Sequence, residues 1–117
     1  MFRPIDDQDI TILREHILLP ILLTVFEHDK KKILQGGIKI TRPYIAVIDN
    51  AMDRVTRDMA ALRKEIKKRG IKIVKEQGDS YSIQYEFVCR GLHQVFAMPR
   101  EFIKAETEVR MTKYLQK

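Results

Sequence analysis

The sequence predicts an α+β fold in which helices pack against a small antiparallel β-hairpin or three-stranded sheet, followed by a C-terminal helix. Two segments predict it: residues 45–66 have the apolar spacing of a helix, and residues 71–89 alternate as the strands of a hairpin do. The chain has 117 residues, of which 44% are hydrophobic and 32% charged. These values indicate a single globular domain over 1–117 with a modest core.

The first helix is expected to begin at the acidic residues 6–9, which supply N-cap candidates and suit the positive end of the helix dipole. Lys30–Lys32 favour its C-terminal end, and Gly36 and Gly37 provide the stop. Pro20 removes one backbone hydrogen bond inside this helix, which predicts a kink or a break. The residues around Pro20 are apolar on every side. They are therefore expected to be buried, either by their own domain or by a second subunit.

A short β-like stretch is expected at 36–41, because Ile38 and Ile40 alternate with Lys39. Thr41 is a plausible N-cap for the next helix, and Pro43 suits an early helical position. This stretch therefore predicts a connection between two helices that contains a short strand.

The second helix is the clearest element in the sequence. Its apolar residues are spaced alternately by three and four positions over three heptads: Ile45, Ile48, Met52, Val55, Met59, Leu62 and Ile66. These residues form an apolar seam along one side of the helix. Their spacing continues through 49–53 without a shift, which favours one helix over 43–69. Asn50 tolerates a left-handed turn, and Asp53 could cap a new helix, so a break near 49–53 is the alternative.

Residues 71–89 predict a β-hairpin with its turn at Gly78 and Asp79. Strict alternation assigns one face of the second strand to Tyr81, Ile83, Tyr85, Phe87 and Cys89. Residues 93–98 predict a third strand, and Pro99 opens a final helix within 99–117 whose apolar stripe is weak.

Positive charge is concentrated between residues 54 and 75. This segment holds nine Lys or Arg residues against two acidic ones, a net charge of +7, whereas the whole chain carries +6. The side of the second helix opposite the seam carries a stripe at helical spacing: Arg54, Arg57, Ala61, Lys64 and Lys68. A stripe of this kind is often only a solvated surface. One-sided charge that continues into the next strand favours phosphate binding, and a slim basic helix fits a major groove about 12 Å wide.

The order of these elements resembles a winged helix-turn-helix domain over 10–90, with the best match at 55–87. In that family, the helix before the wing enters the major groove and the wing contacts the DNA backbone or the minor groove. Members of that family have a turn between their second and third helices. The resemblance therefore implies a turn near 49–53 in this sequence. It implies a DNA-binding surface formed by Arg54, Thr56, Arg57, Lys64, Lys67, Lys68, Lys72 and Lys75.

The sequence indicates no catalytic chemistry. His16, His28 and His93 lack metal-ligand spacing, and no phosphate-binding glycine loop is present. Cys89 falls on the inward face of the hairpin, which favours a buried, inert thiol over a nucleophile. We therefore expect a non-enzyme with no metal, no cofactor and no catalytic residue.

The cellular setting is expected to be the cytoplasm. Cys89 has no second cysteine for an internal disulfide, which suits a reducing compartment. The longest apolar stretch, 17–26, contains a proline and is far shorter than the roughly 20 residues of a membrane span. These observations predict a soluble protein with no membrane partner.

The expected function is that of a small DNA-binding protein, a transcriptional regulator or a phage-type accessory factor. It would bind duplex DNA through helix 54–69 and hairpin 71–88. The alternative is a non-enzymatic homo-oligomeric interaction module whose basic face docks an acidic partner, and an RNA binder is a distant third. A homodimer through residues 10–26 and the C-terminal helix fits both leading hypotheses. Salt-dependent binding to random duplex DNA separates these two.

Overall fold

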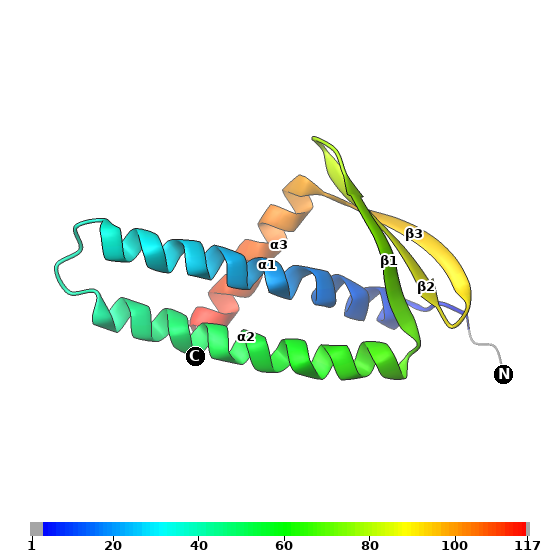
Figure 1. Ribbon diagram of the computed structural model, residues 1–117, viewed down its shortest axis with the longest axis horizontal. Coiled ribbons are helices and arrows are strands. Elements are labelled where there is room, and N and C mark those ends of the chain that lie inside the picture. The colour runs from blue at the N-terminus through cyan, green and yellow to red at the C-terminus, as the bar shows by residue number, and fades with distance from the viewer. Residues whose placement is uncertain (1–3, 117) are drawn as a thin grey trace.

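The computed structural model describes residues 4–116 and has two long helices, a three-stranded sheet at one end of them, and a third helix that crosses them (Figure 1). The elements in chain order are α1 (Asp7–Gln35), α2 (Arg42–Lys68), β1 (Ile71–Gly78), β2 (Ser82–Cys89), β3 (Leu92–Pro99) and α3 (Arg100–Leu115). The molecule is elongated, with extents of 59 × 31 × 19 Å. The predicted α+β class, with its sheet and C-terminal helix, is confirmed.

Helix α1 begins with a reciprocal capping box. Asp6 is the N-cap, and its Oδ1 accepts a hydrogen bond from the Asp9 backbone nitrogen at 2.8 Å. Asp9 Oδ2 accepts from the Asp6 nitrogen at 3.1 Å. The helix then continues through Pro20, so the break predicted as one possibility at this residue does not occur. Leu18 and Leu19 are buried just before the proline, and this packing holds the helix together where one backbone bond is missing.

Helix α2 is a single helix from Arg42 to Lys68, and its seam faces the core. Ile48, Ala51 and Val55 are buried at helical spacing on one side of it, as expected of one continuous helix. The break near 49–53 that the winged helix-turn-helix resemblance required is therefore absent. What remains of the resemblance is a basic helix followed by a β-hairpin.

The sheet is antiparallel throughout, in the order β1-β2-β3. Tyr85, Phe87 and Cys89 of β2 are buried on its inner face, as the alternation predicted. Tyr81 was assigned to the same face but lies in the β1–β2 turn, where its side chain is 84% exposed. The short strand expected at 36–41 is also wrong. That segment is the loop between α1 and α2, at the opposite end of the molecule from any strand it could pair with (Figure 1).

Helix α1 contributes to both hydrophobic cores. Leu13, Ile17 and Leu18 pack under the sheet, with Phe87 and Met98 among their neighbours. Further along, α1 packs against α2 through a second set of buried residues: Leu19, Leu22, Phe26, Ile48, Ala51 and Val55. The helix is thus apolar on every side because elements of its own chain cover it from two directions.

Candidate nucleic-acid interface

Six cationic side chains form an exposed surface on α2 and β1, which we call the basic face. They are Arg57, Lys64, Lys67, Lys68, Lys72 and Lys75. Within residues 4–116, none of the six takes part in an ion pair. Their charges are therefore available to a partner.

The heptad seam determines where the α2 part of this face points. Because the seam is buried against α1, Arg57, Lys64 and Lys68 lie on the opposite side of the helix, with Lys67 beside them. The eleven residue steps from Arg57 to Lys68 correspond to about 16 Å along the helix axis. This part of the basic face is therefore a straight row of cations.

The strand register determines where the β1 part points. Lys72 is paired with Val88, and Lys75 is paired with Glu86. Val88 and Glu86 alternate with the buried residues of β2, so both lysines project from the outer face of the sheet. Only Arg69 and Gly70 separate α2 from β1 in the chain, so the second part of the basic face begins where the first part ends.

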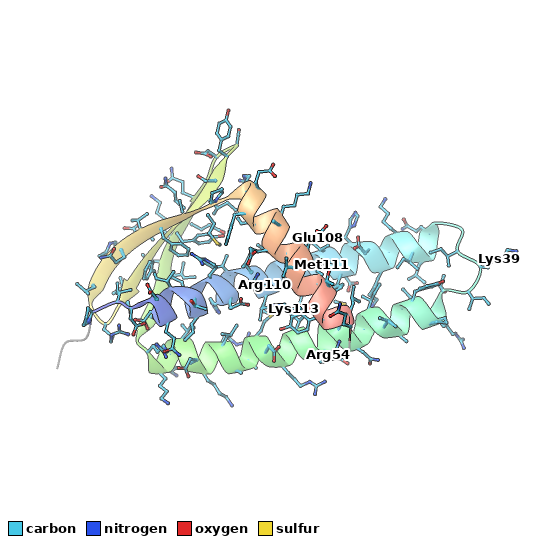
Figure 2. The ribbon with its side chains drawn as sticks, turned by 180° about the vertical axis from the view of Figure 1, so that it is seen from behind. Lys39, Arg54, Glu108, Arg110, Met111 and Lys113 are labelled. Carbon is cyan, nitrogen blue, oxygen red and sulfur yellow. The ribbon has the colours of Figure 1, made fainter. Side chains whose placement is uncertain are left out.

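Two of the eight residues predicted to contact DNA are already engaged. Arg54 was expected to face solvent but is half-buried, and its Nη2 donates a hydrogen bond to the carbonyl of Tyr114 in α3 (Figure 2). The Tyr114 hydroxyl also donates to Asp58, so α3 packs against this side of α2. Thr56 is exposed, but its hydroxyl donates to the Met52 carbonyl at 2.9 Å within the helix.

The hollow between α2 and α3 beside Arg57 carries charges of both signs. Arg110 donates to Glu15 at 2.9 Å and to Glu106 at 2.8 Å (Figure 2 labels Arg110). These interactions raise the pKa of Arg110, with Glu15 as the main cause. Since its charges neutralise one another, this hollow offers less to an anion than the basic face does.

Arg69 lies within the basic segment of the sequence but points inward. Its Nη1 lies 2.9 Å from Asp9 Oδ1, and Arg90 Nη2 lies 2.6 Å from Asp9 Oδ2. The Asp9 side chain is fully buried, and the hydrogen bond from Arg90 is the main reason that its pKa falls well below the usual range. We call Asp9, Arg69 and Arg90 the Asp9 cluster.

The Asp9 cluster joins three segments that are distant in sequence. Arg90, in the β2–β3 turn, also donates to the carbonyl of Arg69 at 3.0 Å and, through its backbone nitrogen, to the carbonyl of Gly70 at 2.9 Å. Arg90 has a φ of 50°, a left-handed backbone conformation, and these contacts hold it there. The cluster thus fixes the α2–β1 junction, and with it the relative position of the two parts of the basic face. The sequence indicates only a capping role for the acidic residues 6–9, because the partners of Asp9 lie 60 and 81 positions away.

The remaining residues with potential reactivity have structural explanations. Among residues 4–116, no three His, Cys, Asp or Glu side chains gather as a metal site would require. His16 is half-buried, and burial, followed by the nearby charge of Arg63, lowers its pKa. Cys89 is fully buried, which confirms the predicted position of its thiol.

An apolar groove of about 670 Å³ runs between α1 and α3. Its lining includes Ile21 and Val25 from α1, and Ile103, Met111 and Leu115 from α3. Six apolar residues of 10–26 are buried in the two cores, whereas Ile21 and Val25 are half-buried and line this groove. The predicted dimer surface on residues 10–26 and the C-terminal helix is therefore reduced to this groove.

None of the three helices within residues 4–116 combines the length and apolar character needed to cross a membrane.

Fold and surface together define a small α+β protein with a helical hairpin, an end sheet and a basic face. The chain belongs to the YhjD protein family, whose family model matches residues 4–117. It is similar to a protein of Bacillus subtilis (strain 168) described as uncharacterized protein YhjD, with 26% identity over 104 residues. The similarity covers 89% of this chain and 87% of that protein. No solved structure matches the chain.

Proposed function

We propose that this protein is a non-enzymatic DNA-binding protein of the cytoplasm whose basic face contacts the phosphate backbone of a duplex. One observation carries the proposal: six exposed cations on two adjoining elements have no ion-pair partner within residues 4–116. Surfaces that only need to be soluble mix charges of both signs. A one-sided array instead fits a partner with regularly spaced negative charge.

The shape of the basic face favours a duplex over a compact anion. The α2 row of cations is about 16 Å long, and phosphates on one DNA strand advance about 3.4 Å along the axis per nucleotide. The row therefore matches about five nucleotide steps of a strand. Ala60 and Ala61 lack bulky side chains, so α2 stays slim between Arg57 and Lys64.

The geometry supports contacts to the backbone more than reading of base sequence. Within the continuous α2, no turn presents a separate recognition helix, and the cations lie in a row along its side. In this proposal, the β1–β2 hairpin takes the position of a wing, with Lys72 and Lys75 on its outer face. A transcriptional regulator and a phage-type accessory factor would both need this contact between the basic face and the phosphate backbone.

The test is the affinity of the protein for a duplex of random sequence, measured over a series of salt concentrations. If all six cations neutralise phosphates, the slope of log K against log salt should be about −5, since each contact contributes roughly −0.9. Duplexes of different sequence should give similar slopes. Absence of duplex binding even at low salt would refute the proposal.

The apolar groove between α1 and α3 favours a second candidate role. A homo-oligomeric module would cover Ile21, Val25, Met111 and Leu115 with a second copy and present the basic face to an acidic protein. Dimerisation alone does not separate the two roles, because many DNA-binding proteins are dimers. An acidic protein that binds with little salt dependence, where DNA does not bind, would favour the second role.

A further inference from the structure

The end of the helical hairpin that lies farthest from the sheet has a composition of its own. We call residues 30–48 the hairpin tip: they comprise the end of α1, the connecting loop and the first turns of α2. Figure 1 shows this loop at the opposite end of the molecule from the sheet, and Figure 2 labels Lys39 within it. The tip shares no residue with the basic face.

The tip is purely cationic. It contains Lys30, Lys31, Lys32, Lys39 and Arg42 and no acidic residue, which gives a net charge of +5. Asp29 and Asp49 lie immediately outside it at the two ends of the segment. With +7 in residues 54–75 and +6 in the whole chain, all other residues together carry −6. The protein therefore has two separate basic surfaces.

The tip is also where apolar side chains are exposed. Five of the ten exposed large hydrophobic side chains among residues 4–116 lie in it: Leu34 (61%), Ile38 (41%), Ile40 (69%), Tyr44 (57%) and Val47 (48%). A single exposed apolar residue needs no explanation, whereas a gathering of this kind marks an interaction site.

We propose that the hairpin tip docks on an anionic lipid surface, with its apolar side chains inserted and its cations among the headgroups. A duplex would use the charges but would leave Ile38, Ile40 and Leu34 exposed. A second copy of the tip would cover the apolar residues but would bring two cationic surfaces together, since within residues 4–116 only Lys30 among the five cations is paired with an acid, Asp49. An anionic bilayer surface satisfies both features, because it attracts cations and accepts apolar groups.

The dimensions of the tip fit insertion into the interfacial layer. Lys31 lies about 6 Å, and Val47 about 8 Å, from the loop ends of their helices, by the rise of 1.5 Å per residue. Apolar faces that dock on membranes enter to roughly 5–10 Å. When Ile38 and Ile40 are inserted to that depth, the lysines of α1 reach the level of the headgroups.

An ion pair at the boundary of the tip, between Lys30 inside it and Asp49 just outside it, holds the two helices together. Lys30 Nζ lies 2.6 Å from Asp49 Oδ1, which joins the end of α1 to α2. Docking on a surface requires no membrane-spanning segment, so this proposal is compatible with the hydropathy of the three helices. It differs from the expectation of no membrane partner, which rested on the length of segment 17–26 and on its proline.

Vesicle co-sedimentation tests the proposal, with vesicles of phosphatidylglycerol and phosphatidylcholine compared with vesicles of phosphatidylcholine alone. The wild type should bind the anionic vesicles in low salt and the neutral ones far more weakly. The double variant Ile38→Asp and Ile40→Asp should bind the anionic vesicles at least about tenfold less. Tyr81→Asp is the matched control, since Tyr81 is an exposed residue of the β1–β2 turn and its variant should bind as the wild type does.

Two charge variants distinguish the tip from the basic face. Lys31→Ala with Lys32→Ala should weaken vesicle binding and leave duplex binding nearly unchanged. Arg57→Ala with Lys64→Ala should do the reverse. Vesicle binding by a wild type that fails to bind DNA would support this inference and refute the proposed function.

Three results would overturn the inference. The first is a wild type that does not bind anionic vesicles in low salt. The second is vesicle binding that survives Ile38→Asp with Ile40→Asp but is lost in Arg57→Ala with Lys64→Ala, because the basic face would then be the contact. The third is a wild type that sediments as a dimer and becomes a monomer in Ile38→Asp with Ile40→Asp, while both proteins bind anionic vesicles equally well. Circular dichroism melting curves of each variant verify that the fold is retained.

Discussion

Arg90 Nη2 lies 2.6 Å from Asp9 Oδ2, across 81 positions of the sequence. The carboxylate is fully buried, and Arg69 binds its other oxygen at 2.9 Å. A buried charge is tolerated only when it is paired and hydrogen-bonded, and here two arginines from different elements supply that pairing. The contact therefore ties the start of α1 to both the α2–β1 junction and the β2–β3 turn.

Replacement of Asp9 by Asn should destabilise the fold strongly. The variant removes the buried counter-charge of Arg90 and leaves Arg69 with Glu65 alone. Loss of one partner of a buried ion pair costs up to about 3–5 kcal/mol in the free energy of unfolding. Denaturant unfolding measures it. Asp7→Asn is the matched control, since Asp7 lies exposed in the same helical turn and should cost less than about 1 kcal/mol. Equal effects of the two variants would show that the cluster contributes nothing beyond the helix terminus.

The stability of the wild type should fall in acid for the same reason. The pKa of Asp9 is depressed in the native state, so the unfolded chain binds a proton at this site more readily than the folded one. The stabilisation is complete above the unfolded pKa of about 4 and is lost as the pH falls below it, toward the native value. Unfolding curves between neutral and acidic pH should show a steeper loss for the wild type than for Asp9→Asn. Parallel curves would contradict this account.

The thiol of Cys89 should react only when the protein opens. Its side chain is fully buried in the core under the sheet, next in sequence to Arg90 of the Asp9 cluster. A thiol reagent should therefore label the native protein slowly, and faster in Asp9→Asn, because opening becomes more frequent as stability falls. Rapid labelling of the stable wild type would show that the strand is accessible and would reopen the possibility of a reactive cysteine.

A homodimer is expected to form through the groove between α1 and α3. Leu115→Asp places a charge in that groove and should shift the protein toward monomer in sedimentation at micromolar concentration. Val109→Asp is the control, because Val109 is exposed on α3 to a similar extent (45% against 38% for Leu115) but lies outside this groove. A wild type that sediments as a single 13.8 kDa species would contradict the dimer.

Periodicity made the main elements predictable. The α2 seam and the alternation of β2 each report burial of one face, and Val55 and Phe87 are buried as those patterns require. The same reasoning failed at Ile38 and Ile40, where alternation suggested a strand but no strand of residues 4–116 lies within reach. The alternation of apolar residues shows that a segment could form a strand, but a strand forms only where another strand is close enough to pair with it.

The basic face was predictable only in part, because contacts between distant segments decide which cationic side chains are exposed and which bind other parts of the chain. Helix phase alone placed Arg54 in the outward stripe, whereas the docking of α3 engages it with Tyr114. Arg69 is drawn inward by Asp9, which lies 60 positions earlier. The weak apolar stripe of α3 gave no indication of where that helix would pack.

The most direct test of the central claim compares the salt dependence of duplex binding for the wild type and for Arg57→Ala with Lys64→Ala. Both residues lie on the outward side of α2, away from the seam, and alanine favours helix, so the fold should be retained. If these two residues bind phosphates, the double variant should bind every sequence more weakly. The slope of log K against log salt should be smaller by about two, roughly one unit for each lost phosphate contact. Lys31→Ala with Lys32→Ala removes the same charge elsewhere and should leave the slope nearly unchanged. A double variant on the basic face that keeps the affinity and slope of the wild type would contradict the account.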